Sequence, residues 1–542
     1  METVSACWPK PGADSSLNLQ GIPVFWANYR RLRVPSVAGV FSKDRPIFRL
    51  NSKPLACYFQ GMNTRSSTHT GRFLNQQLSR RNVLQMGGGV MGGLGLSQLL
   101  EAQSRSGKAN DSHSNPAVIF IWLPGGPPHM ETYDMKPNAP VEYRGEFRPI
   151  QTNVSGIEVC ELLPFHSKIA DKFTLIRSCH HEFADHGGGH KRFLTGRKPK
   201  TPTGFVNDAP MVGSIAAKFH AEKASTTDLE NYVVLGNGRV NNVDTFSFGS
   251  AYLGSETHPF RISADPNADQ FRIQNLALTG GLFEERLNDR IGLMRGMDSL
   301  RKKIENQDLG RSIDRFNDRA LGMITSKAAR TAFDLSQEND SLRDRYGRHE
   351  WGQRALLSRR LVEAGVPWVT VVMENPYVSG IRMPLYGTYN WDSHAVNCHL
   401  FKDSVIRLPL YDQVITALIE DLYDRGLDRR VLLVVTGEFG RTPRLNSQTG
   451  TQTKISQPGR DHWPRAMSLL VSGGGMQTGQ VVGATNEKGE EPRQRPLTPN
   501  DLWASVYQHL GVNPEKSYLD RSGRPMPILP FGKAIKELAP VS

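Results

Sequence analysis

Short, uninterrupted apolar runs constrain the fold of this chain more than any other feature of its sequence. The first run covers 117–123 and ends in Pro-Gly-Gly-Pro-Pro, which is typical of a strand that is buried on both faces and leads into a loop at the edge of a sheet. Apolar residues at helical spacing separate several of the runs. The further runs lie at 173–177, 232–235, 368–373, 431–436 and 467–471, and the helical patterns at 282–324, 342–364 and 408–423.

Strands that alternate with helices predict an α/β fold. We expect a three-layer α/β/α sandwich with a mainly parallel central sheet, in which the polar stretch 446–460 is a surface loop. Ligands of such sheets bind beyond the carboxyl ends of the strands. The residues that directly follow the apolar runs are therefore the candidates for function.

Composition excludes several classes of protein. The chain has 542 residues, of which 38% are hydrophobic and 22% charged, as in an ordinary globular protein with a sizeable core. Its five cysteines are scattered and form no CxxC pair, so they indicate neither a zinc ribbon nor a disulfide framework. The net charge is +13, but residues 1–104 hold 12 Lys and Arg against 4 Asp and Glu. The remainder is only mildly basic, so we expect no nucleic-acid partner.

The N-terminal part of the sequence indicates export. Residues 79–84 read Ser-Arg-Arg-Asn-Val-Leu and precede a weakly apolar, glycine-rich run at 86–100, the pattern of a twin-arginine signal. This run is too short and too rich in glycine to form a stable transmembrane segment. We interpret 62–104 as the signal region and 1–61 as a mispredicted N-terminal extension. The expected partner is then the twin-arginine export machinery, and the expected location is the periplasm or another extracytoplasmic space.

Potential metal ligands gather in five segments that share one topological position. A single histidine or aspartate at a strand end is usually a cap or a surface residue, but so many of them are harder to explain in that way. Mixed imidazole and carboxylate groups favour a transition metal such as zinc or manganese over calcium, and their number suffices for one or two ions. The segments are 129–134, 180–190, 391–394, 437–443 and 459–463.

The segment 185–197 carries a second signal. His186 and His190 are four residues apart, so on a helix they share one face, and three glycines lie between them. A lysine and two arginines follow, which favours an anion such as phosphate or sulfate near the free backbone amides at the helix start. The alternative is a glycine-rich turn whose histidines bond to neighbouring carbonyls.

Five elements of the sequence carry a family resemblance. They are Pro-Gly-Gly-Pro-Pro-His-Met-Glu-Thr-Tyr-Asp at 124–134, Trp-Asp-Ser-His at 391–394, Gly-Glu-Phe-Gly-Arg-Thr-Pro at 437–443, Gly-Arg-Asp-His-Trp at 459–463 and Asp-Arg-Ser-Gly-Arg-Pro at 520–525. With them the chain resembles the bacterial domain of unknown function family 1501 over about 115–535. That family is similar to the alkaline phosphatase and sulfatase superfamily, so the resemblance implies an alkaline-phosphatase-like fold and metal-assisted chemistry on phosphate or sulfate esters.

The resemblance also implies a set of site residues. It places His186 at the reaction centre, where the superfamily has its nucleophile, and a histidine there could act covalently, bind a metal or serve as a base. Phe439 stands where the superfamily has a metal-binding histidine. The implied anion-binding residues are His190, Arg441 and Arg460, and the implied metal ligands are Glu131, Asp392, His394, Glu438, Asp461 and His462.

Three hypotheses about function follow. The first is an exported, metal-dependent hydrolase whose substrate is a sulfate or phosphate ester, either an anionic small molecule or a glycan ester. The second is a catalytically inactive member of the same fold that binds anions or glycans, which His186 and Phe439 favour because they replace a nucleophile and a ligand. The third, a structural protein of an envelope assembly, is supported by export alone.

Overall fold

The computed structural model describes residues 115–539, except for 205, 224–228, 237–246, 270, 272–325 and 378–380. All of the described residues fall in one compact unit, Leu94–Ser542. The predicted extension, the predicted signal region and the helical pattern at 282–324 lie outside them. None of the described helices is long and apolar enough to cross a membrane.

An eight-stranded sheet forms the centre of this unit, with its strands in the order β14-β4-β13-β8-β1-β7-β5-β6. Every apolar run of the sequence forms one of these strands. The strands are β1 (Ala117–Trp122), β4 (Thr174–Cys179), β5 (Tyr232–Leu235), β6 (Phe260–Ile262), β7 (Trp368–Val372), β8 (Val431–Thr436), β13 (Met467–Gly473) and β14 (Gln480–Val482).

The sheet is mainly parallel, which confirms the prediction. β1 lies in its middle and pairs in parallel with β7 on one side and β8 on the other, so that Val118 lies opposite both Trp368 and Leu432. Within the described part of the sheet, β13 is the one reversed strand, because it pairs antiparallel with both β4 and β8. The sequence could not indicate this reversal, since strands buried on both faces show the same apolar pattern in either direction.

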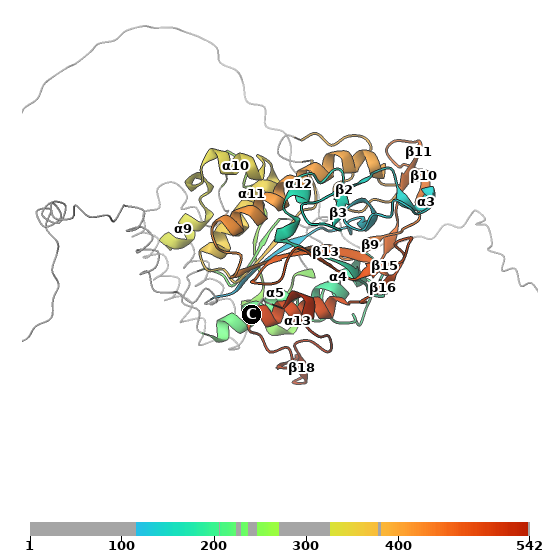
Figure 1. Ribbon diagram of the computed structural model, residues 1–542. Coiled ribbons are helices and arrows are strands. Elements are labelled where there is room, and N and C mark those ends of the chain that lie inside the picture. The colour runs from blue at the N-terminus through green and yellow to red at the C-terminus, as the bar shows by residue number, and fades with distance from the viewer. Residues whose placement is uncertain are drawn as a thin grey trace, which may run out of the picture. The chain divides into compact units, whose positions relative to one another are not determined.

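Helices cover both faces of the sheet, which confirms the three-layer α/β/α sandwich (Figure 1). Side chains of β1 alternate between two hydrophobic cores, with Ile119 and Ile121 in one and Phe120 and Trp122 in the other. The first core includes residues of α9 (Lys327–Phe333), α10 (Asp340–Tyr346), α11 (Glu350–Glu363) and α12 (Leu400–Asp424). The second includes residues of α4 (His186–Thr195), α5 (Val212–Glu222) and α13 (Pro499–Leu510).

Three sequence expectations need correction. The helical pattern at 342–364 forms two helices, because Gly347, with a φ of 98°, ends α10 before α11 begins. The pattern at 408–423 is the later part of α12, which starts eight residues earlier, at Leu400, and contains Pro409. The stretch 446–460 is not a loop but an antiparallel hairpin of two strands.

The remaining elements are short. Among the described residues, five two-stranded pairs lie outside the large sheet, and several single turns of 3-10 helix connect the longer elements. The pairs are β2 (Pro149–Gln151) with β3 (Glu158–Cys160), β9 (Gly440–Arg441) with β12 (His462–Trp463), β10 (Asn446–Thr449) with β11 (Ser456–Gly459), β15 (Ala484–Thr485) with β16 (Pro492–Gln494), and β17 (Ser517–Leu519) with β18 (Pro525–Pro527). The helical turns are α3 (Val141–Arg144), η1 (His129–Glu131), η2 (His166–Lys168), η3 (Ala170–Lys172), η4 (Ala251–Leu253), η5 (Ser255–Thr257), η6 (Leu335–Gln337) and η7 (Lys536–Leu538).

Candidate metal centre

The candidate site lies where parallel strands end, as the fold predicts. Glu438 follows β8, and its two carboxylate oxygens accept hydrogen bonds of 2.9 and 3.0 Å from the backbone N–H of Gly125, which follows β1. Gly125 has a φ of 107°, and a Cβ there would lie 2.5 Å from the backbone nitrogen of Asp392. Glycine is therefore required at this position, because the loops after β1 and β7 touch there.

Helix α4 begins at the site. The Asp185 side chain accepts a 3.1 Å hydrogen bond from the backbone N–H of Gly188 and thereby caps the helix just before His186. His186 and His190 then lie one turn apart on one face. A Cβ at Gly189 would lie only 3.0 Å from the Phe439 ring. The glycine-rich segment is therefore a tightly packed helix and not the turn of the alternative interpretation.

Four side chains from three segments of the chain converge at the start of this helix. One potential ligand atom each from His186, Asp392, His394 and His462 lies within 4.8 Å of the others. The Nε2 atoms of His394 and His462 are 2.8 Å apart, and they lie 3.1 and 3.3 Å from Oδ1 of Asp392. Three imidazoles and one carboxylate form a donor set that suits zinc or manganese. We call these four residues the His/Asp cluster.

His186 also belongs to a second group, with His190 and Glu438. Its Nδ1 lies 2.7 Å from Oε1 of Glu438, and Nε2 of His190 lies 3.2 Å from the same oxygen. On its other side, Nε2 of His186 lies 3.4 Å from Oδ2 of Asp392. The two groups together offer ligands for one or two ions. His190, which the sequence indicated as an anion-binding residue, is thus placed among potential metal ligands.

Electrostatic interactions keep both carboxylates of the site ionised. Burial by itself raises the pKa of Asp392, but Arg441 and the neighbouring histidines outweigh burial and hold this pKa well below its usual range. Burial likewise raises the pKa of Glu438, and the two histidines of its group more than reverse that shift. Burial lowers the pKa of His462, which favours the neutral ring that a metal ligand needs. The pKa of His186 is raised despite burial, because hydrogen bonds to both carboxylates favour its charged form.

Arg441 holds the cluster in place. Its buried guanidinium donates from Nη2 to Oδ1 of Asp392 at 2.7 Å, from Nε to the carbonyl of Gly126 at 3.0 Å and from Nη1 to the carbonyl of Arg460 at 3.2 Å. A further bond runs from Nη2 to the carbonyl of Gly125, so the guanidinium is engaged with Asp392 and with backbone carbonyls. The structure does not direct this predicted anion-binding residue towards a ligand.

Glu131 and Arg460 are not part of the His/Asp cluster, although the sequence indicated a metal ligand and an anion-binding residue. They form an ion pair with each other, in which Nη2 of Arg460 lies 2.6 Å from Oε1 of Glu131. Nη2 of Arg460 also donates to the Tyr143 carbonyl at 2.7 Å and Nη1 to the Thr442 carbonyl at 2.9 Å. Both side chains are almost completely buried, at 1% and 0% exposure. This pairing satisfies the charges that would otherwise face a metal or an anion, so we no longer propose either role.

Asp461 contacts the cluster from outside. Its Oδ1 accepts a 2.6 Å hydrogen bond from Nδ1 of His394, and its Oδ2 accepts one of 2.5 Å from the Asn446 side chain. Among the described residues, Asp461 belongs to neither group of potential ligands. A carboxylate in this position fixes the tautomer and orientation of a ligating histidine.

A pocket of about 710 Å³ opens beside His462. Its lining includes His180, Trp463 and Arg465. The guanidinium of Arg465 lies 5.9 Å from the centre of the Trp463 ring, and this arginine is 63% exposed. This pocket was not predicted from the sequence, although the position of Trp463 directly after a predicted ligand was a signal that could have pointed to it.

The chain belongs to the family described as "Protein of unknown function (DUF1501)", whose model matches residues 115–539. This match confirms the family that the five sequence elements predicted. No curated protein matches the chain.

Several solved structures are similar to this chain at low identity. Ps i-CgsB in complex with k-i-k-neocarrahexaose is 12% identical, with a TM-score of 0.33, over 74% of this chain and 73% of that one. The lipoteichoic acid synthase LtaP from Listeria monocytogenes is 8% identical, with a TM-score of 0.33, over 74% of this chain and 77% of that one. The phosphonate monoester hydrolase of Agrobacterium radiobacter is 11% identical, with a TM-score of 0.32, over 74% of each chain.

Proposed function

We propose that this protein is a metal-dependent hydrolase of a sulfate or phosphate ester. The observation that carries the proposal is the way in which the rings of His394 and His462 are held. Asp461 accepts a hydrogen from Nδ1 of His394, and the carbonyl of Ala184 accepts one from Nδ1 of His462 at 2.7 Å. In neutral rings both Nε2 atoms then carry lone pairs, and these face each other across 2.8 Å. A cation bound by both nitrogens makes this arrangement favourable.

The residues of the site fit a divalent metal ion. We propose the His/Asp cluster as the ligands of one ion, with His190 and Glu438 available to a second ion that shares His186. Zinc or manganese suits these donors best. A divalent ion there would supply Lewis acidity and would make water a stronger acid at neutral pH.

We propose that His186 binds metal and is not the nucleophile. Its ring nitrogens face Glu438 on one side and Asp392 on the other, so neither is directed at a substrate. Water is then the attacking group: its oxygen forms a bond to sulfur or phosphorus, the bond from that atom to the ester oxygen breaks, and the proton that the water loses is taken up by the leaving ester oxygen. Arg441 and Asp461 assist by orienting Asp392 and His394.

The pocket beside His462 supports an anionic substrate. Arg465 lines it, interacts with the Trp463 ring and forms a 2.9 Å ion pair with the exposed Glu491, which an anionic substrate would displace. An exposed guanidinium can pair with the charged oxygens of a sulfate or phosphate group through two hydrogen bonds. The substrate class that we propose is therefore an anionic small molecule or a glycan ester.

Hydrolysis of 4-nitrophenyl sulfate and of 4-nitrophenyl phosphate by the full chain, loaded with zinc or manganese, tests this proposal. We expect turnover of one of them by the wild type and none by His462→Ala. The matched control is His220→Ala in α5, a histidine outside both ligand groups, which should retain the wild-type rate. The proposal would be contradicted if the metal-loaded protein hydrolysed neither of the two nitrophenyl esters nor sulfated oligosaccharides.

The second candidate function is a protein that binds anions or glycans without catalysis. The observation in its favour is Phe439, whose ring centre lies 4.6 Å from that of His462 and 5.2 Å from that of His186. An apolar ring thus covers one side of the cluster. Bound metal together with binding of a sulfated oligosaccharide, but no turnover, is the result that this candidate predicts.

We also propose that the protein acts outside the cytoplasm after export by the twin-arginine machinery. The support is the Arg80-Arg81 pair and the glycine-rich run that follows it. A reporter protein fused behind residues 62–104 should reach the periplasm of a wild-type bacterium and remain in the cytoplasm when both arginines are changed to lysine. Retention of the wild-type fusion in the cytoplasm would contradict export.

A further inference from the structure

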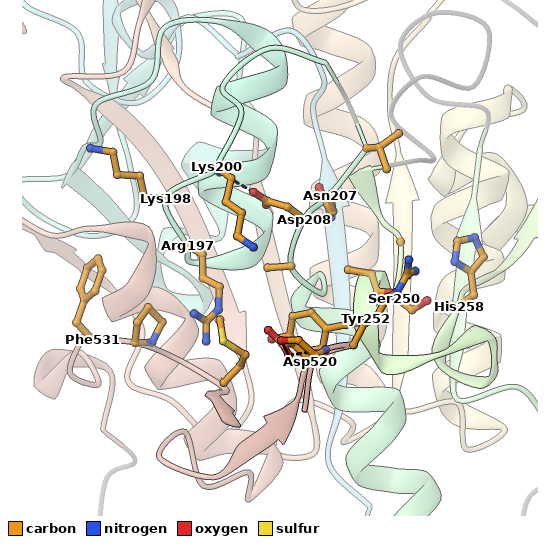
Figure 2. A pocket seen from close by; sticks show the side chains of 18 residues that line it. Arg197, Lys198, Lys200, Asn207, Asp208, Ser250, Tyr252, His258, Asp520 and Phe531 are labelled. Carbon is orange, nitrogen blue, oxygen red and sulfur yellow. Dashed lines mark hydrogen bonds between the residues drawn. The ribbon is translucent and has the colours of Figure 1, made fainter. Parts of the chain in front are cut away.

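A second pocket, of about 810 Å³, lies among Arg197, Tyr252 and Asp520 (Figure 2). The ten residues of α4 begin with His186 and span about 15 Å. Arg197 follows the end of this helix and lines the pocket, whose other walls come from η4 and from the β17–β18 hairpin. We call it the α4 pocket. Its lining shares no residue with the two groups of potential metal ligands. Asn207 in its wall donates to the carbonyl of Ser247, whose hydroxyl lies 3.4 Å from Nδ1 of His190.

Positive side chains dominate the charged lining of the α4 pocket. Arg197, Lys198, Lys200 and Arg521 line it, against two carboxylates. Within the part of the chain that the structure describes, none of these four forms an ion pair. Arg521 instead donates to the carbonyl of Ala251 at 3.2 Å. Figure 2 shows the side chains of Arg197 and Lys200 directed into the same space. The pocket therefore attracts an anion.

The two carboxylates of the lining are occupied in the local structure. Asp208 accepts a 2.5 Å hydrogen bond from the backbone N–H of Lys200, and Asp520 accepts bonds of 2.9 and 3.0 Å from the backbone N–H groups of Ser522 and Arg524. Their negative charges still repel a ligand with closely spaced negative charges. A ligand whose negative groups are separated by neutral parts fits this lining better than a nucleic-acid backbone does.

Asn207 adds an unused hydrogen-bond acceptor. Its side chain is 7% exposed and its Nδ2 donates to the carbonyl of Ser247. Its Oδ1 has no hydrogen-bond partner among the described residues. A buried acceptor left unpaired is costly, so a ligand that brings a hydroxyl hydrogen to this atom gains affinity.

Apolar and aromatic groups complete the pocket. Phe531 is 53% exposed and stacks on the Arg192 guanidinium at 5.5 Å, while the Tyr252 ring lines another part of the wall. Flat aromatic faces pack well against the C–H faces of sugar rings. An anionic saccharide combines separated negative charges, hydroxyl hydrogens and apolar ring faces.

We propose that the α4 pocket binds an anionic oligosaccharide, with Lys198 and Lys200 at its negative groups, Asn207 at a hydroxyl and Phe531 against a ring face. The proposal does not depend on the proposed function, because it needs neither a metal ion nor catalysis. A carbohydrate chain held here would be bound at a distance from the His/Asp cluster.

Calorimetric titration of the full chain with a heparin-derived hexasaccharide, in the presence of a chelator, tests the proposal. We expect binding that weakens by about tenfold or more in Lys198→Gln/Lys200→Gln and that also weakens in Phe531→Ala. The matched control is Lys454→Gln/Lys536→Gln, which removes two exposed positive charges outside the pocket lining and should leave the affinity within about twofold of wild type. Neutral maltohexaose should not bind.

Four outcomes would overturn the proposal. Equal weakening in the two double variants would show non-specific charge attraction. Equally tight binding of inorganic sulfate would show a simple anion site, and tighter binding of a single-stranded thymidine dodecamer would show a nucleic-acid site. Binding that is lost in His462→Ala, or that occurs only when the chelator is left out, would place the saccharide at the metal centre, which would remove this inference and leave the proposed function standing.

Discussion

The Nε2 atoms of His394 and His462 face each other at 2.8 Å, although the two residues are 68 positions apart in the sequence. Each ring is held in this orientation by a hydrogen bond from its other nitrogen. In neutral rings whose Nδ1 atoms donate these bonds, both Nε2 atoms carry lone pairs across this short distance, and a cation bound by both nitrogens would stabilise that arrangement.

Asp461→Asn should weaken metal binding while it leaves the fold intact. The amide can present its N–H to Nδ1 of His394 and so select the opposite tautomer, in which Nε2 carries a hydrogen and no lone pair. We expect the affinity for zinc to fall by about 10- to 100-fold, measured by competition with a chromogenic chelator. Asp424→Asn, at an exposed position near the end of α12, is the control. Equal affinity of both variants would refute the orienting role of Asp461.

Arg460→Met should destabilise the protein strongly. Glu131 and Arg460 are almost completely buried, so the variant leaves a carboxylate without its charge partner. We expect the free energy of unfolding to fall by about 3–5 kcal/mol in urea denaturation. Arg493→Met, at a site that is 67% exposed, should change it by less than about 0.5 kcal/mol. If Arg460→Met cost as little as this control, the pair would not have the structural role that we assign to it.

Gly459→Ala should separate two halves of the His/Asp cluster. A Cβ at this position would collide with the backbone of Ala395 and His394, so the segment that carries His462 must move away from the one that carries His394. We expect loss of metal binding, measured as metal content after gel filtration, with retained α/β circular dichroism. Gly156→Ala is the control, because a Cβ there meets no atom within 4 Å, although its φ is 83°. Normal metal content in Gly459→Ala would argue against this close approach.

Glu350 should make a contribution to stability that is lost as the pH rises from about 4.5 to 7, against the opposite contribution of buried histidines such as His129 and His181, whose pKa burial lowers to about 4. Burial raises the pKa of Glu350 to about 7 from the ordinary value of 4.5, partly offset by Arg354. Between these two values the folded chain keeps a proton that the unfolded chain releases, so raising the pH favours unfolding, by up to about 3 kcal/mol. Glu350→Gln should remove this part of the pH dependence of the urea midpoint. The exposed Glu487→Gln should not change it, and identical pH profiles for wild type and Glu350→Gln would show that the group does not titrate in this window.

The sequence predicted the inner strands of the sheet but not its two edge strands. All of the long apolar runs are strands, because burial on both faces leaves a continuous apolar pattern. It did not predict β6 and β14, each three residues long, because a short edge strand has no room for a recognisable pattern. The hairpin at Asn446–Gly459 was not predicted, because its two strands are polar and show no apolar alternation, although Gln457 of β11 is buried.

The candidate site was predicted in position but not in every role. His186, Asp392, His394 and His462 follow different elements and still meet, since parallel strands end at one edge of the sheet. Glu131 also follows an apolar run, yet its carboxylate pairs with Arg460, which is 329 positions away in the sequence. Which charged side chain finds a partner depends on the packing of distant loops, and local sequence does not encode it.

The most direct test of the account is the metal content of the full chain, purified without chelator and measured by inductively coupled plasma mass spectrometry, in the wild type, His394→Ala and His462→Ala. If the His/Asp cluster binds metal, we expect one or two equivalents of zinc or manganese per wild-type chain and loss of metal in both variants. A wild-type chain that holds no metal even after incubation with both ions would contradict it.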